Sequence, residues 1–282
     1  MKYAICNETF QNQDWAETCR AVAGFGYAGI EVAPFTLGED VADISVQARR
    51  SYADTARREG LEVVGLHWLL VSPKGLSVTS ADASVRDRTT RYLADLVTFC
   101  ADIGGGVLVL GSPGQRRLPT DVPSEEAAYV AIDRLQACLE PALETAHRSG
   151  ITVCLEPLPA PEADFILTLQ AAVDIIERIQ HPALRTIFDV KSASSEGRPL
   201  PDLIHTFAPR IAHVHANDAN RRGPGFGTTD YIPIFSALKA IAYTGYVSVE
   251  VFDYTPDPYT IARESLAYMK RCAKAVEDEH GI

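Results

Sequence analysis

Long hydrophobic runs are absent from this sequence of 282 residues, in which no window approaches about 18 uninterrupted apolar residues. A helix that crosses a bilayer needs about 20 such residues, so we expect no membrane partner. The N-terminal segment MKYAICNETFQNQDW turns polar after its sixth residue, which is too soon for the apolar core of a signal peptide. The sequence therefore predicts a cytoplasmic protein.

Paired cysteines are also lacking. The six cysteines show no CxxC spacing and mostly sit inside apolar runs. They are Cys6, Cys19, Cys100, Cys138, Cys154 and Cys272. This pattern favours buried free thiols in a reducing compartment over a disulfide framework.

Positive charge is in deficit, since 26 Lys and Arg stand against 37 Asp and Glu, for a net charge of -11. Proteins that bind nucleic acid need a basic surface to neutralise phosphates, so nucleic acid is excluded as the main partner. The remaining composition, 46% hydrophobic and 22% charged, is that of a globular protein with a large core.

Short strand-like runs alternate eight times with longer amphipathic stretches. The predicted strands are Tyr3–Cys6, Gly26–Val32, Leu61–Leu66, Val107–Leu110, Ile151–Pro157, Thr186–Asp189, Ile211–His215 and Tyr246–Val251. The predicted helices are Asp14–Gly24, Ser45–Gly60, Ser80–Ile103, Pro123–Gly150, Leu167–Ile179, Leu200–Phe207, Tyr231–Ala242 and Pro258–Val276. Such alternation requires parallel strands, and eight of them close most simply into a single (β/α)8 barrel domain over residues 1–282.

An open doubly wound sheet is the main competing fold. It would carry a glycine-rich fingerprint after an early strand, whereas Gly104, Gly105 and Gly106 precede their strand. The barrel is therefore the better prediction.

Four predicted strands, the fifth to the eighth, end in a side chain that can bind a metal ion: Glu156, Asp189, His215 and Glu250. Active sites of (β/α)8 barrels lie at these carboxyl ends, so the four side chains should converge. Three carboxylates and one imidazole suit Mn²⁺, Mg²⁺ or Co²⁺ better than structural Zn²⁺, and an octahedral ion would keep positions open for a substrate. The sequence thus predicts a Lewis-acid site.

Each of these residues also has a purely structural interpretation. Glu156 or Asp189 could cap the next helix or pair with an arginine, and His213 or His215 could be a hydrogen-bonded core histidine. Four buried polar groups at consecutive strand ends would, however, repeat a burial cost without gain. The two histidines lie on one face of their strand, with His215 nearer the barrel mouth.

Several segments resemble the xylose isomerase-like sugar isomerase/epimerase superfamily, and most closely its D-tagatose/D-psicose (ketose) 3-epimerase branch. The first segment is LEPL at 155–158, which is followed by Glu162 and by FILT at 165–168. The second is FD at 188–189. The third is HVH at 213–215, which is followed by Asn220-Arg221 and by PGFG at 224–227, and the fourth is Val249-Glu250. We call Glu156, Asp189, His215 and Glu250 the quartet. The spacings of 33, 26 and 35 residues between its successive members also resemble that branch. Hydroxypyruvate isomerase and inosose dehydratase are relatives of the same superfamily.

The resemblance implies that Glu156, Asp189, His215 and Glu250 hold one divalent metal ion, Mn²⁺ before Mg²⁺ or Co²⁺. It implies that Glu156 and Glu250 are also the catalytic acid/base pair, which moves a proton next to a carbonyl through a metal-stabilised cis-enediolate. Glu162 resembles the residue that accepts a substrate hydroxyl in that family. Arg221 resembles its substrate-orienting arginine. A sugar substrate and a homodimer or homotetramer are implied in the same way.

Three further residues at predicted strand ends are candidates for the pocket or for the core. His67 could face the sugar, Trp68 could supply an apolar wall, and Glu31 could be a pocket acid. One position departs from the epimerases, which carry a histidine three residues after the metal-binding aspartate. This chain has Ser192 there, with Lys191 beside it.

Other functions fit parts of the same pattern. A lyase or dehydratase would use the same proton abstraction to expel a leaving group from a keto-sugar, a keto-inositol or a 3-keto-glycoside. Endonuclease IV shares the barrel but needs a trinuclear zinc cluster with more histidines. A non-catalytic sugar-binding or assembly subunit would be expected to lack part of the quartet. The loop Gly111–Arg117 could bind an anion, although no phosphate site is evident.

Overall fold

The computed structural model describes residues 1–11 and 13–279 and places eight parallel strands in one closed barrel. The strands are β1 Lys2–Cys6, β2 Gly29–Val32, β3 Glu62–Leu66, β4 Val107–Leu110, β5 Thr152–Leu155, β6 Leu184–Asp189, β7 Ile211–Ala216 and β8 Tyr246–Val249. They follow each other around the barrel in sequence order, and β1 pairs with β8 from Lys2↔Tyr246 to Ile5↔Val249 to close it. The predicted (β/α)8 barrel is confirmed.

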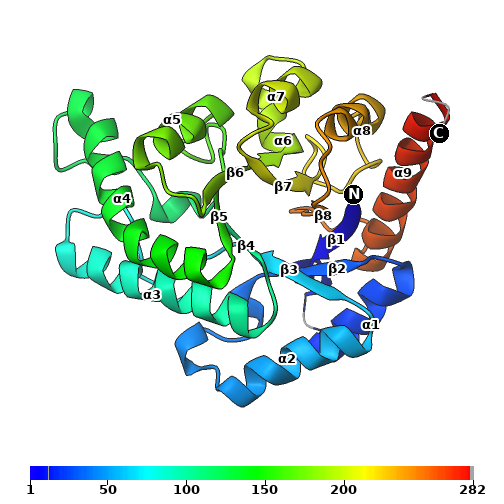
Figure 1. The fold of residues 1–282 in the computed structure, drawn as a ribbon, viewed down its shortest axis with the longest axis horizontal. Helices are drawn as coiled ribbons and strands as arrows, with labels where there is room; N and C mark the ends of the chain where they lie inside the picture. The colour runs from blue at the N-terminus through cyan, green and yellow to red at the C-terminus, as the bar shows by residue number, and fades with distance from the viewer. Residues whose placement is uncertain (12, 280–282) are drawn as a thin grey trace.

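Helices surround the strands on the outside (Figure 1). They are α1 Trp15–Phe25, α2 Val46–Arg58, α3 Ala83–Asp102, α4 Ser124–Ser149, α5 Leu169–Ile179, α6 Val190–Ala193, α7 Leu200–Phe207, α8 Tyr231–Ala240 and α9 Pro258–Glu279. Side chains at their starts explain why they begin where they do. Asp14, Asp82 and Thr168, for example, each accept a hydrogen bond from a main-chain N–H in the first turn of the next helix.

The boundaries differ from the predicted ones mainly where a cap residue intervenes. The second strand begins at Gly29 rather than Gly26, because Gly26 adopts φ +90° and ends α1. Strands β5 and β8 stop at Leu155 and Val249, so Glu156 and Glu250 stand just beyond the strands rather than within them. The short helix α6, directly after β6, was not predicted.

The core consists of the inward faces of the helices packed on the strands. All six cysteines are buried in it as free thiols, which confirms that prediction. Over the described residues no helix has the length and apolarity needed to cross a membrane.

Candidate active site

The four predicted ligands meet at the carboxyl end of the barrel. One ligand atom each from Glu156, Asp189, His215 and Glu250 lies within 4.8 Å of the other three. All four side chains are buried. The parallel strands bring them together because their carboxyl ends all open onto the same end of the barrel.

His215 presents one ring nitrogen to the carboxylates and the other to the barrel interior. Its Nδ1 lies 3.1 Å from Glu250 Oε2 and 3.5 Å from Glu156 Oε1. Its Nε2 lies 2.9 Å from Glu31 Oε1, and the second oxygen of Glu31 lies 2.8 Å from His213 Nε2. Glu31 therefore fixes the orientation of His215 from below, and lies inside the barrel rather than on the pocket wall.

The residues present fit a single divalent cation. His215 Nδ1 and Glu156 Oε1 are buried, face each other and have no hydrogen-bond partner. Atoms that ligate one octahedral ion at about 2.1 Å lie about 3 to 4 Å apart, and the separations of 3.1 and 3.5 Å fall in that range. A hard oxygen-rich set with one imidazole suits Mn²⁺, Mg²⁺ or Co²⁺.

In the metal-free protein, burial and the closeness of the charged groups shift the pKa values of the three carboxyl groups. Burial, together with the charge of Glu250, raises the pKa of Glu156 to about 7, although His215 counteracts this. Burial acts to raise the pKa of Glu250 as well, but His215 and then His67 outweigh it, so the pKa of Glu250 is lowered. Burial and the charge of Glu250 raise the pKa of Asp189.

Asp189 is held by the turn that follows it. Its Oδ1 accepts a hydrogen bond from the main-chain N–H of Ser192 at 2.6 Å, and its Oδ2 accepts one from Asn217 Nδ2 at 2.7 Å. Asp189 is thus the N-cap of α6. Ser192, at the position that departs from the epimerase pattern, contributes its main chain, while its buried hydroxyl has no partner.

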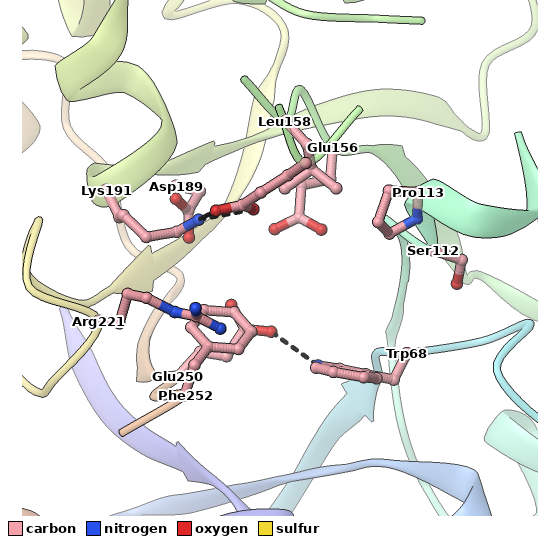
Figure 2. Close-up of a pocket in the computed structure, with 11 residues that line it drawn as sticks. Trp68, Ser112, Pro113, Glu156, Leu158, Asp189, Lys191, Arg221, Glu250 and Phe252 are labelled. Atoms are coloured by element: carbon pink, nitrogen blue, oxygen red, sulfur yellow. Dashed lines mark hydrogen bonds and ion pairs between the residues drawn. The ribbon is translucent and has the colours of Figure 1, made fainter. Parts of the chain in front are cut away.

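A cavity of about 260 Å³ opens above the quartet. Figure 2 shows the carboxylates of Glu156 and Glu250 pointing toward its central space. Trp68 Nε1 donates a hydrogen bond to Glu250 Oε1 at 3.2 Å. The apolar part of the wall comes from Trp68, Leu158 and Phe252.

Two of the three predicted substrate-binding residues line this cavity, and the third lies beneath it. Glu162 accepts hydrogen bonds from Lys191 Nζ at 2.8 and 2.9 Å. Arg221 lies over the ring of Phe252, 5.5 Å from its centroid. His67 is buried in the barrel, where its Nε2 lies 2.8 Å from Glu8 Oε2, and it is not part of the cavity wall.

Several residues of the site were not predicted from the sequence. Phe252 and Glu8 lie outside every motif considered there, and only the fold brings them to the site. Lys191 was noted only as a neighbour of Ser192, yet its ammonium group pairs with Glu162 across 29 residues of chain. The alternation of strands and helices could locate strand ends, but not the loop residues that pack over them.

Arg116 is a second unforeseen feature. It lies in the loop after β4 and is only 1% exposed, and within residues 1–11 and 13–279 none of its three guanidinium nitrogens has a hydrogen-bond partner. Burial lowers its pKa to about 10, and the charges of Glu156 and Asp164 offset part of that effect. An anion on loop Gly111–Arg117, which the sequence allowed without predicting, would meet Arg117 at the surface before it reached this buried group.

Comparison with known proteins supplies independent information. A family model described as xylose isomerase-like TIM barrel matches residues 19–272. The chain is 25% identical over 288 residues to a 3-dehydro-D-guloside 4-epimerase of Escherichia coli, across 96% of this chain and 100% of that protein. It is 25% identical over 225 residues to a D-psicose 3-epimerase of Agrobacterium fabrum, across 77% of this chain and 76% of that protein. In fold it matches a solved L-ribulose 3-epimerase with a TM-score of 0.85 at 21% identity, covering 99% of this chain and 97% of that one.

Proposed function

The chain belongs to the xylose isomerase-like TIM barrel family, and we propose that it is a sugar epimerase or isomerase that depends on one divalent metal ion. Its substrate is a ketose or a keto-sugar derivative, and the reaction begins with removal of a proton next to the carbonyl. The observation that carries this proposal is the convergence of Glu156, Asp189, His215 and Glu250 on one point at the floor of a cavity.

The metal ion, Mn²⁺ before Mg²⁺ or Co²⁺, would be held by these four side chains and would supply positive charge where negative charge develops on the substrate oxygens. The quartet is buried, so water is largely excluded and the charges act more strongly than in solvent. Glu31 and Trp68 hold His215 and Glu250 in place through hydrogen bonds.

Glu156 and Glu250 are the proposed acid/base pair. Their surroundings push their pKa values apart, since that of Glu156 is raised to about 7 and that of Glu250 is lowered. This difference describes the metal-free protein, and separated pKa values are common in acid/base pairs. Each should contribute a factor of about 10² to 10⁴ to the rate.

The remaining cavity residues suit a sugar ring. Glu162 and Lys191 form a charged pair that can accept and donate hydrogen bonds to hydroxyl groups, and Arg221 adds donors on the same wall. Trp68 and Phe252 provide flat apolar surface, with their rings 6.1 Å apart. A few placed polar groups in an aromatic-lined pocket are the usual composition of a small-molecule site.

The test is to incubate the purified protein in D₂O with D-psicose and with a methyl 3-keto-glucoside, after loading with Mn²⁺ or stripping with a chelator. We expect deuterium to appear beside the carbonyl, with inversion or carbonyl migration, only in the metal-loaded sample. Loss of the methoxy group without epimerisation of either sugar would instead identify a lyase. Absence of exchange on both substrates, with metal bound, would overturn the proposal.

A further inference from the structure

A second cavity, of about 570 Å³, adjoins the one above the quartet and shares Trp68 with it. The catalytic cavity, at about 260 Å³, lies just below the range of about 300 to 1,000 Å³ typical of small-molecule sites. It is therefore sized for one sugar ring and little more. The second cavity has room for another ring.

Aromatic side chains form much of the second cavity's wall. Phe10, Trp15, Phe35 and Tyr254 line it together with Trp68. Phe35 packs edge-on against Trp68 with ring centroids 6.1 Å apart, and it remains 40% exposed. An exposed aromatic ring at the mouth of a cavity offers a flat surface on which the C–H face of a pyranose can pack.

Glu8, a residue of the second cavity's wall, has a carboxylate oxygen that finds no hydrogen-bond partner among the described residues. Glu8 is only 5% exposed; its Oε2 lies 2.8 Å from His67 Nε2, while its Oε1 is buried and has no partner. Among the described residues, the side-chain oxygen of Gln13, which also belongs to this wall, is likewise buried without a partner. Buried acceptors without a donor are costly, and ligand hydroxyl groups are suitable donors.

The two cavities are close at their floors. One carboxylate oxygen of Glu8 and one of Glu250 lie within 4.8 Å of each other, with a ring nitrogen of His67 equally near. Trp68 marks the boundary: its backbone has φ +53°, an unusual value for a tryptophan, and its indole nitrogen is bonded to Glu250. A molecule held at the proton-transferring glutamates could therefore extend past Trp68 into the second cavity.

We propose that the second cavity binds a second sugar ring, so that the substrate is a keto-disaccharide rather than a free ketose. This inference rests on the proposed function for the ring in the catalytic cavity. The second ring packs against Phe35 and Trp68, and one of its hydroxyl groups donates a hydrogen bond to Glu8 Oε1.

The test compares deuterium exchange by the Mn²⁺-loaded protein on 3-keto-cellobiose and on 3-keto-glucose. We expect kcat/KM to be at least tenfold higher for the disaccharide. Phe35→Ala should lower the ratio of kcat/KM on the disaccharide to kcat/KM on the monosaccharide at least tenfold. Glu8→Gln should also lower this ratio. Tyr129→Ala removes an aromatic ring that is 68% exposed on α4, outside both cavity walls, and should leave the ratio unchanged.

Equal kcat/KM values on the two sugars, with a ratio that Phe35→Ala does not alter, would overturn the second-ring site while leaving the proposed function intact. If neither sugar is turned over, calorimetry with unreactive cellobiose and glucose decides the second-ring site, while exchange on D-psicose and methyl 3-keto-glucoside decides the proposed function. Binding of cellobiose at least tenfold tighter than glucose, lost in Phe35→Ala, would support it. Equal binding of the two would overturn it.

Discussion

The two ring nitrogens of His215 contact different groups. Nδ1 faces the carboxylates of Glu156 and Glu250, and Nε2 is bonded to Glu31, which in turn is bonded to His213. The hydrogen bond at Nε2 fixes the ring so that Nδ1 is the nitrogen available to a metal. Glu31 therefore acts through His215 and is a positioning residue.

Glu31→Gln should weaken binding of Mn²⁺ by about 10- to 100-fold, because the substitution loosens the orientation of the ligand His215. Calorimetric titration of the metal-free protein measures this directly. Glu62→Gln, which changes an exposed carboxylate at the start of the next strand, β3, is the matched control and should leave the affinity unchanged. Equal affinities for the two variants would contradict the role given to Glu31.

Metal binding should release protons, and more of them at pH 6 than at pH 8. Burial and Glu250 raise the pKa of Glu156 to about 7, so in the metal-free protein this carboxyl is mostly protonated at pH 6 and ionised at pH 8. Burial acts to lower the pKa of His215, but Glu250 and Glu31 outweigh it and the pKa is raised well above its usual value. This shift favours the protonated form of His215, which has to lose its proton to bind the ion.

Release of more protons at pH 6 than at pH 8 is the expected result, with apparent affinity falling as the pH drops below 7, because only the deprotonated groups bind the ion. Titrations in buffers of different ionisation enthalpy count the protons. Proton release that does not change between these pH values, or tighter binding in acid, would contradict the assignment.

Among the elements, the strand ends were predictable and the loops above them were not. The alternation of apolar runs located Glu156, Asp189, His215 and Glu250 because each follows or ends a short buried strand. The helix α6 has only four residues, too few for any periodicity to show. Its first turn nevertheless orients Asp189.

Contacts between loops that are far apart in the sequence could not be predicted, for a different reason. Trp68 was a candidate for an apolar wall or for the core, and its hydrogen bond to Glu250 spans 182 residues of chain. Glu8 joins the site only because β1 and β3 lie two places apart in the closed barrel, which brings it against His67. No local pattern marks either contact, and which loops meet above the barrel is decided by packing that the sequence pattern does not reveal.

Replacement of Arg116, in the loop after β4, should not lower stability. Arg116→Met should leave the free energy of unfolding unchanged or raise it by up to about 4 kcal/mol, because it replaces a buried, unpaired charge with an apolar side chain. It should also raise the pKa of Glu156, whose charge the guanidinium attracts, and move the acid limit of metal binding to higher pH.

Urea unfolding of the metal-free protein tests the stability of this variant. Arg148→Met, on an exposed arginine near the end of α4, is the control and should change the free energy of unfolding by less than about 0.5 kcal/mol. Destabilisation of Arg116→Met by more than 2 kcal/mol, as an order-of-magnitude threshold, would mean that the guanidinium has a stabilising partner.

At the scale of the whole molecule, barrel closure makes the first and the last strand neighbours. Pairing of β1 with β8 places the loop after β1, with Glu8, beside the loop after β8, with Glu250. The site therefore depends on the entire barrel, and a metal ion bound to four strand ends should stabilise the entire fold.

Mn²⁺ at about 100 times its Kd should raise the free energy of unfolding by about 2.7 kcal/mol, which corresponds to a rise of roughly 5 °C in Tm for a protein of this size. Asp189→Asn should reduce the rise, whereas Asp174→Asn, at an exposed position of α5, should not. A well-folded preparation whose Tm does not respond to any divalent ion would favour a non-catalytic sugar-binding subunit.

The central claim is that Glu156 and Glu250 exchange a proton with opposite faces of one carbon, and deuterium exchange in the two single variants tests it most directly. Glu156→Gln and Glu250→Gln, each with its metal content verified, are incubated in D₂O with each of the two epimers that the wild-type protein interconverts. Both variants should fold and lose epimerisation by about 10² or more. Each should still exchange the proton of one epimer without inverting it, and the two variants should act on opposite epimers. Retention of more than about a tenth of the epimerisation in either variant, or exchange of the same epimer by both, would contradict the two-glutamate account.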